Sequence, residues 1–231
     1  MTTLEIILSI LPGLAICIFI YLMDAYDREP GWLLFISFLL GALVTLPAIE
    51  MEKFGMSLGL YESDHLGITF LYAYVVVAFS EEIVKFVGLR FWAYPQKSFD
   101  EPMDGIVHAI IIGMGFATVE NLLYASLFDA NTILLRAFTA VPAHASFAVV
   151  MGYFMGLSKF EEGAKKWRMK LQGLGLAVFM HGTYDFLLFQ KEVEFLAIGS
   201  ILGLGISVWY SFKLIRIHVE NSPFKEEDYI L

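Results

Sequence analysis

The chain has 231 residues, of which 58% are apolar and only 17% charged, and its formal net charge is −9. A soluble domain carries about 25% charged residues, so this composition excludes an ordinary water-soluble protein and indicates an integral membrane protein. Nucleic acid is not an expected partner, because no stripe of Lys and Arg joins aromatic residues, and the single cysteine, Cys17, excludes an intrachain disulfide.

Seven apolar stretches follow one another, each close to the roughly 20 residues that a helix needs to cross a bilayer. They lie at about residues 4–23, 32–49, 66–91, 104–127, 133–157, 171–189 and 195–217. The breaks between them are short and polar. We therefore predict an all-α polytopic bundle of about seven spanning helices. Residues 1–218 would form the transmembrane domain and residues 219–231 a polar cytoplasmic tail.

The Lys and Arg residues predict how such a bundle lies in the lipid bilayer. With seven spans, eleven of the fifteen basic residues fall on one side of the membrane. Lys53, Arg136 and Lys191 fall on the other side, and Lys85 lies within a span. The positive-inside rule makes the side with eleven charges cytoplasmic. The N-terminus is then expected outside the cell and the C-terminus inside.

Six ionisable residues stand out because they interrupt the apolar stretches. They are Glu81, Glu82, Glu120, His144, His181 and Asp185. A charge at bilayer depth costs a few kcal/mol or more, so membrane proteins retain one only where it faces another polar group or a water-filled cavity. We predict that the six side chains meet in one polar site inside the bundle.

The third predicted helix carries Ser80-Glu81-Glu82-Ile83-Val84-Lys85. Glu81 and Lys85 are four residues apart, so they share a helix face and are predicted to pair. Glu82 lies about 100° round the axis, and no local partner is expected for it. One glutamate held ionised by Lys85 beside a second in a dry environment is a workable general-base arrangement. The structural alternative is a buried ion pair that only holds helices in register.

Three further helices carry the remaining candidates. On the fifth, Pro142 frees a backbone carbonyl and is expected to kink the helix just before His144. On the sixth, His181 and Asp185 share a face, so the carboxylate can orient the imidazole. Glu120 lies toward the outer end of the fourth helix.

The inner end of the fourth helix carries Asp104 and His108, which are four residues apart. Both lie close in depth to Lys85. We predict an interfacial cluster there, with Asp104 paired to Lys85.

Carboxylates and histidines in a water-accessible cavity suit the hydrolysis of an amide bond. A glutamate takes a proton from water, and a histidine positions that water or donates to the leaving amine. The same residue types suit a catalytic zinc site, for which the ligands would be Glu82, Glu120, His144 and His181, and residue spacing leaves zinc open. No other cofactor is predicted. A proton-coupled transporter with a Glu/His relay is one alternative, and a non-catalytic scaffold that binds transmembrane helices is another.

The ensemble of motifs resembles the PrsW family of bacterial intramembrane proteases, which are distant relatives of the CAAX prenyl endopeptidases. The residues that carry the resemblance are Glu81-Glu82-x-x-Lys85, Phe116-x-x-x-Glu120-Asn121, His144 and His181-x-x-x-Asp185. It begins at the turn Tyr26-Asp27-Arg28-Glu29-Pro30 and extends over most of the chain. In the prenyl endopeptidases a histidine stands where this chain has Glu120, and their first motif carries Arg where this chain has Lys85.

This resemblance implies a multi-pass protein of the bacterial cell membrane that makes a site-1-type cut in a single-pass anti-sigma factor, on its extracytoplasmic side. The partners would then be a membrane-anchored protein substrate and the lipid bilayer. It also implies Glu81 or Glu82 as the base and His181 as the water-positioning or acid partner. Glu120, His144 and Asp185 would act as orienting or oxyanion-side groups.

Overall fold

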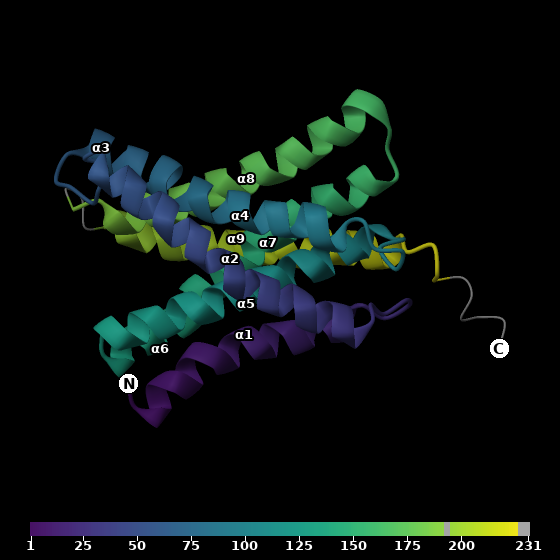
Figure 1. Cartoon of the computed structure of the whole chain (residues 1–231), viewed down its shortest axis with the longest axis horizontal. Helices are drawn as coiled ribbons and strands as arrows, with labels where there is room; N and C mark the ends of the chain where they lie inside the picture. The colour runs from purple at the N-terminus through teal and green to yellow at the C-terminus, as the bar shows by residue number, and fades with distance from the viewer. Residues whose placement is uncertain (192–194, 226–231) are drawn as a thin grey trace.

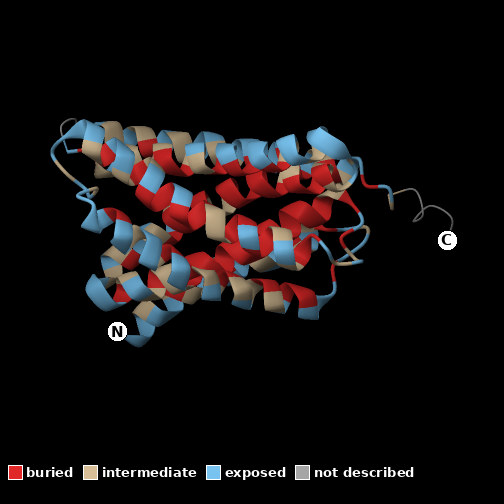
Figure 2. Ribbon diagram, turned by 45° about the horizontal axis from the view of Figure 1, so that its top comes forward, coloured by how far each residue is buried: buried red, intermediate tan, exposed pale blue. Residues whose placement is uncertain are grey.

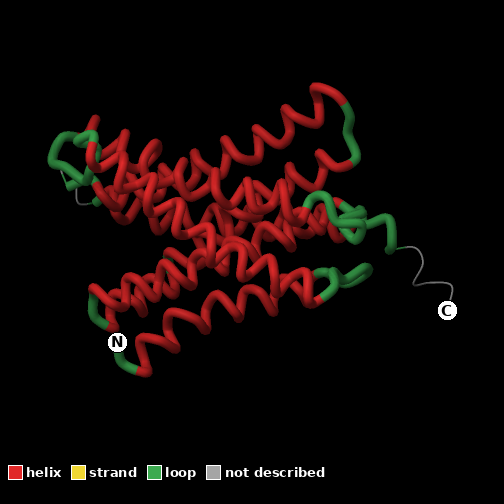
Figure 3. Tube along the Cα trace, in the orientation of Figure 1, coloured by secondary structure: helices red, strands yellow, loops and turns green. Residues whose placement is uncertain are grey.

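Long helices joined by short connections make up the described part of the chain, which is residues 1–191 and 195–225 of a computed structural model (Figures 1 and 3). Within these two ranges there is no strand. The prediction of an all-α polytopic bundle is therefore confirmed. Residues 226–231 of the predicted tail lie outside the described residues.

The chain passes along the bundle seven times in its described part, and five of these passes are single helices. They are α1 (Thr3–Met23), α2 (Gly31–Ser57), α5 (Pro102–Leu127), α8 (Gly163–Phe189) and α9 (Leu196–Glu220). The third pass is continuous but contains two π-helical stretches: α3 (Leu66–Leu71), η1 (Tyr72–Ala78), α4 (Phe79–Gly88) and η2 (Leu89–Ala93). The fifth pass consists of α6 (Ala130–Phe138) and α7 (Ala140–Lys159).

Six of the passes in the described residues are long and apolar enough to cross a membrane, so the chain is a multi-pass membrane protein. The exception is α8, whose first turns carry Lys165, Lys166 and Arg168 and whose later part carries His181 and Asp185. The N-terminus and the last turn of α9 lie at opposite ends of the bundle, as an odd number of passes requires (Figure 1).

Two helices differ from their predicted bounds in ways that affect the site. The second was expected to end at residue 49 but runs to Ser57, because Glu, Met and Lys are good helix formers once the apolar stretch has ended. The predicted helix 133–157 is interrupted at Thr139. Pro142 explains the interruption, since its ring occupies the space that the carbonyl of Phe138, four residues earlier, would need. The proline effect is thus a break before α7 and not a kink within it.

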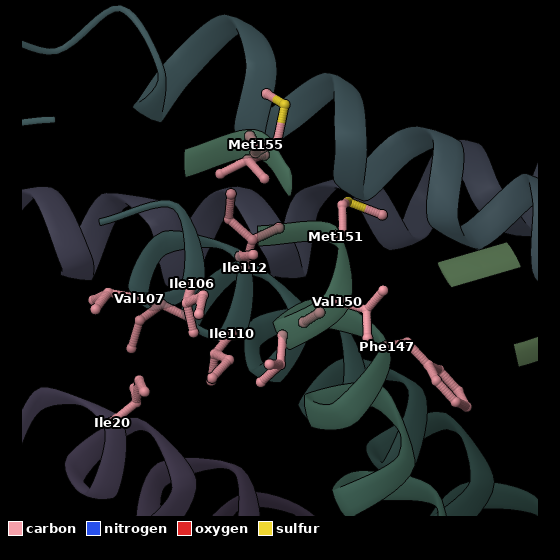
Figure 4. Close-up of a cluster of buried hydrophobic side chains, with 14 of the residues drawn as sticks. Ile20, Ile106, Val107, Ile110, Ile112, Phe147, Val150, Met151 and Met155 are labelled. Atoms are coloured by element: carbon pink, nitrogen blue, oxygen red, sulfur yellow. The ribbon is translucent and has the colours of Figure 1, made fainter. Parts of the chain in front are cut away.

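The core is built around α5, which is buried along most of its length and packs chiefly against α7, α2 and α1. Figure 4 shows Ile106 and Ile110 of this helix beside Val150 of α7, with Ile20 of α1 close by. Buried residues face the middle of the bundle and exposed ones face outward (Figure 2). Many exposed residues are large and apolar, as expected of helices that face lipid.

Two glycines let the helix backbones approach closely enough to place the site. A Cβ on Gly156 of α7 would overlap the carbonyl oxygen of Pro102 on α5. A Cβ on Gly182 of α8 would overlap the ring of Tyr74 on η1. Small residues commonly permit such contacts between membrane helices. These two contacts hold α7 against α5, and α8 against the third pass.

The predicted pair between Asp104 and Lys85 does not form. Asp104 instead accepts hydrogen bonds from the N–H groups of Asp100 and Glu101, both at 2.8 Å, and so caps the first turn of α5. His108 lies 3.2 Å from the carboxylate of Glu29. The turn that contains Glu29 is therefore joined to the first turns of α5, at the end of the bundle where α9 ends.

Asp24, in the connection between α1 and α2, forms an acidic group with Glu29 and Glu101. It is almost completely buried. Burial raises the pKa of Asp24 to about 7, and the charges of Glu101 and Glu29 add to the shift, which the hydrogen bond from the Glu29 N–H opposes. The folded protein therefore binds a proton at Asp24 over a pH range, between about 4 and 7, in which the unfolded chain has released it. In this range folding stability falls as the pH rises.

We expect Asp24→Asn to raise the thermal midpoint of the detergent-solubilised protein by several degrees at pH 8, and to change it little at pH 4.5. The asparagine keeps an acceptor for the Glu29 N–H but carries no charge to bury. Thermal unfolding at the two pH values measures the effect. Asp27→Asn, on the exposed part of the same turn, is the control and should show no such pH dependence. An equal shift at both pH values would contradict the account.

Candidate active site

All six predicted site residues lie close together in the middle of the bundle. Glu81 and Glu82 come from α4, Glu120 from α5, His144 from α7, and His181 and Asp185 from α8. Glu82 lies behind the others. The remaining five line one cavity of about 340 Å³. The cavity lies in the half of the bundle that contains the N-terminus, since it is lined by the last turns of α2, α5 and α8 and by the first turns of α7 and α9.

Lys85 is the centre of this site. Its Nζ lies 3.0 Å from Glu81 Oε2 and 2.8 Å from Glu82 Oε1, and both ion pairs are buried. The predicted pair of Glu81 with Lys85 is therefore confirmed. The expectation that Glu82 has no local partner is wrong, because residues three apart on a helix also meet. Phe116 covers the ammonium, 4.1 Å from its ring centre.

His144 has one ring nitrogen toward each of two charged groups. Its Nδ1 lies 3.2 Å from Lys85 Nζ, and its Nε2 lies 2.9 Å from Glu120 Oε2. An ammonium has no lone pair to accept a hydrogen bond, so Nδ1 must be the acceptor. Nε2 then carries the proton and donates it to Glu120. The neighbours thus fix which ring nitrogen accepts and which donates.

His181 lies between two carboxylates. Its Nδ1 is 2.9 Å from Glu82 Oε1, and its Nε2 is 3.2 Å from Asp185 Oδ2, in the one-turn arrangement that the sequence predicted. Nδ1 forms a hydrogen bond with the Glu82 carboxylate, and Nε2 lies at ion-pair distance from Asp185. The ring of Phe147 stacks on the imidazole, with 4.9 Å between centroids. The two histidines therefore differ in their partners: His144 lies between a cation and a carboxylate, and His181 lies between two carboxylates.

Arg136 of α6 also belongs to the site, although the sequence analysis treated it only as a charge on the outer side. Its Nη2 lies 2.8 Å from Glu120 Oε1, and its Nε donates to Asn121 Oδ1 at 2.8 Å. The guanidinium lies 3.7 Å from the ring centre of Tyr124. The break at Thr139 separates α6 from α7 and gives Arg136 this place. No spacing in the sequence marks the contact, since it depends on how α6 folds back.

Glu52 is a second cavity residue that the sequence analysis missed. The predicted second helix ends at residue 49, three residues before Glu52. In the structure α2 continues, and Glu52 lines the same cavity as Tyr72, Tyr124 and Tyr184. The cavity is thus polar on the α2 side as well.

Acidic and basic side chains form one continuous chain of contacts across the site, from one side of the bundle to the other. In order, they are Arg136, Glu120, His144, Lys85, the pair Glu81 and Glu82, His181 and Asp185. Burying an isolated charge costs several kcal/mol, and a partner at hydrogen-bond distance offsets much of that cost. The network explains how an apolar bundle holds so many ionisable groups.

A family model described as "PrsW family intramembrane metalloprotease" matches residues 29–213, which is most of the chain. The chain belongs to the PrsW family. It is 35% identical over 184 residues to Protease PrsW of Geobacillus kaustophilus, covering 80% of this chain and 79% of the relative. It is 35% identical over 183 residues to Protease PrsW of Bacillus subtilis, covering 78% and 80% of the two chains.

A third relative, Protease PrsW of Halalkalibacterium halodurans, is 31% identical over 212 residues, which are 90% of this chain and 94% of the relative. No solved structure matches the fold. The resemblance seen in the sequence motifs is confirmed, and the chain is an intramembrane protease that acts on a protein. Neither a transporter nor a silent scaffold is needed to explain its buried charges.

The residues of the site fit the metal ion that the family description implies. One ligand atom each from Glu81, Glu82, His144 and His181 lies within 4.8 Å of all the others, and all four residues are buried. Carboxylate oxygens and imidazole nitrogens are ligands that zinc takes. The predicted set had Glu120 where the structure has Glu81. Glu120 lies outside the group of four because it is turned toward Arg136.

The same donors already surround one cation, the ammonium of Lys85. It lies within 3.2 Å of atoms from Glu81, Glu82 and His144, which are three of the four residues in the metal-ligand group. Two positive charges in one buried space repel strongly. The ammonium and a metal ion would therefore compete for these donors.

We expect Lys85→Met to bind zinc at least about tenfold more tightly than the unchanged protein, a difference of about 1.4 kcal/mol. The substitution removes the competing charge and leaves both glutamates in place. Zinc titration of the purified protein, followed by elemental analysis, measures it. The control is Lys53→Met, which breaks an exposed pair of the same kind with Glu50.

Lys85→Met also leaves buried carboxylates unpaired, which is expected to cost about 3–5 kcal/mol of stability without metal. Zinc should then raise the thermal midpoint of this variant more than that of the unchanged protein. If Lys85→Met and Lys85→Gln both fold and bind zinc with unchanged affinity, the Lys85 ammonium does not compete with zinc.

Proposed function

We propose that this intramembrane protease makes a site-1-type cut in a single-pass membrane protein of the anti-sigma-factor class. Water activated by glutamate and histidine would hydrolyse the bond, with no covalent enzyme intermediate. The observation that supports this is the single cavity of about 340 Å³ lined by Glu81, Glu120, His144, His181 and Asp185. Its volume lies within the range of small-molecule sites, enough to take the few residues around a scissile bond.

We assign the general base to Glu81, a choice that the sequence left open between Glu81 and Glu82. Glu81 lines the cavity, whereas Glu82 lies behind it and bonds Lys85 and His181 through one oxygen. Lys85 holds the Glu81 carboxylate in place at 3.0 Å, and this carboxylate would accept a proton from water. Glu82 is a positioning residue, since it acts through the two side chains that it holds.

His181 is the proposed hydrogen-bond and proton donor of the reaction. It faces the cavity and is held by Glu82 and Asp185, so it can stabilise the oxyanion or protonate the leaving amine. His144 and Glu120, backed by Arg136, form the opposite wall and orient the polar groups there. A zinc ion held by Glu81, Glu82, His144 and His181 would supply Lewis-acid polarisation of a carbonyl or water.

In this proposal the N-terminus lies outside the cell and the C-terminus in the cytoplasm of a bacterium. Residues 1–218 form the transmembrane protease domain and residues 219–231 a cytoplasmic tail. Support comes from two connections, which carry Arg28 and Lys97, and from the first turn of α8, which carries Lys165. All three segments lie at the end of the bundle where α9 ends (Figure 1). The cavity then belongs to the outer half of the membrane, where a cut on the extracytoplasmic side requires it.

We expect Glu81→Gln to lower the cleavage rate by about 10²–10⁴-fold while the protein remains folded, because a general base contributes about that much. The assay is release of the outer domain of a single-pass anti-sigma factor reconstituted in liposomes with the protease, with mass spectrometry locating the cut. Glu50→Gln is the control, as Glu50 is an exposed glutamate on α2, and it should cleave at the normal rate.

Two results would contradict parts of this proposal. Normal cleavage by Glu81→Gln together with loss in Glu82→Gln would transfer the base role to Glu82. A cut on the cytoplasmic side, or no cut in any anti-sigma factor although other membrane-anchored proteins are cut, would exclude the proposed substrate class.

The proposed orientation predicts which residues a membrane-impermeant maleimide reaches in intact cells. In a Cys17→Ser background, Ser57→Cys at the end of α2 should be labelled from outside. Lys97→Cys, in the connection before α5, should be labelled only after the cells are lysed. Both positions are exposed, so accessibility reports on membrane side and not on burial. The reverse pattern would exclude the orientation.

A further inference from the structure

Three basic side chains gather around one aromatic ring at the end of the bundle away from the cavity. The Arg90 guanidinium carbon lies 5.0 Å from the ring centre of Tyr94, Lys159 Nζ lies 5.0 Å from it, and Lys170 Nζ lies 4.0 Å from it. These residues come from η2, α7 and α8, so the cluster joins three helices. We call Arg90, Lys159 and Lys170, with the neighbouring Lys166, the basic cluster.

None of the four cations has a carboxylate within 4.0 Å among the described residues, where the ion pairs involve other side chains. Lys170 is almost completely buried, at 1% exposure. Arg90 Nε is buried and has no hydrogen-bond partner in the described part of the chain. Lys159 donates to the Tyr94 carbonyl at 2.6 Å, and Asp100 and Asp104 attract it from beyond ion-pair distance. The cluster therefore carries excess positive charge.

Aromatic rings alone do not balance this charge. A cation over a ring gains about 0.5–2 kcal/mol, but here one tyrosine ring serves three cations, which repel one another. The neighbouring Lys165 shows the contrast, since it pairs with Glu161. Lys170 is buried and the other three cations are partly buried, so an anion from outside the chain would stabilise this group of like charges.

The cluster lies near the end of the membrane-spanning third pass, where lipid headgroups are expected. Trp167 is half-exposed, and its ring lies 4.9 Å from Lys170 Nζ and 5.9 Å from the Arg90 guanidinium. Lys170 directly precedes the apolar stretch 171–189, and Arg90 lies in the last turns of the third pass. Tryptophan and basic residues at the ends of membrane helices are typical of the interface between headgroups and hydrocarbon.

We propose that the basic cluster binds the phosphate of an anionic lipid headgroup, in the leaflet at this end of the bundle. Arg90 supplies the contact, because a guanidinium presents a planar set of donors that matches phosphate oxygens. Lys166 and Lys159 flank the phosphate, and Lys170, covered by Tyr94 and Trp167, contributes its charge from beneath. Basic pockets between membrane helices are suited to such headgroups. The site is separate from the cleavage site and independent of its mechanism.

The test is native mass spectrometry and thermal unfolding of the full-length protein with three probes: phosphatidylglycerol, phosphatidylcholine and inorganic phosphate. We expect phosphatidylglycerol to bind at least about tenfold more tightly than phosphatidylcholine and to raise the thermal midpoint. The double substitution Arg90→Gln/Lys170→Gln should remove this preference. The matched control, Lys165→Gln/Arg168→Gln, removes the same charge from exposed positions on the same turns of α8 and should keep it.

Each alternative outcome would overturn the proposal. An equal loss in the control variant would mean general attraction to an acidic membrane surface. Inorganic phosphate that binds as tightly as phosphatidylglycerol would mean a site for free phosphate. If the double variant does not fold, Arg90→Lys and Lys166→Gln take its place. Arg90→Lys keeps the charge and loses the planar donors, and unchanged lipid preference in both of these variants would exclude the site.

Discussion

Burial of the Lys85 ammonium between Glu81 and Glu82 is the interaction on which the rest of the site depends. A single cation pairs with two carboxylates, and His181 lies beside the second of them, so an apolar bundle can hold both. The same ammonium occupies the Nδ1 lone pair of His144, and one oxygen of Glu82 continues the network to His181. The hydrogen-bond partners of each histidine therefore follow from what Lys85 and the glutamates leave available.

Close packing of the helix backbones brings these groups within reach of one another. At Gly156 there is no room for a side chain between α7 and α5, the helices that carry His144 and Glu120. Gly182, next to His181, has the same role between α8 and the third pass. A larger residue at either glycine would push the helices apart and separate site side chains that now lie within about 3 Å of one another. The effect on the site would be far larger than the volume of the added side chain suggests.

The two ends of the bundle use charge in different ways. At the end near the N-terminus, acids and bases contact one another around a cavity, so the buried charges nearly balance. At the other end the charges are segregated: Asp24, Glu29 and Glu101 form an acidic group, and Arg90 and Lys170 belong to the basic cluster. The acids are accommodated in part by protonation, as the raised pKa of Asp24 indicates. The bases retain an excess charge that suits an anionic ligand.

The sequence by itself determined the class of fold, the number of passes and the six polar residues of the site. Hydropathy and the cost of burying charge depend on local composition alone, and so does the pairing of Glu81 with Lys85. Only the tertiary structure decided that Arg136 and Glu52 join the site and that Glu81, not Glu82, faces the cavity. Those outcomes depend on the helix break at Thr139, on the length of α2 and on how α4 is rotated, which are properties of packing between distant segments.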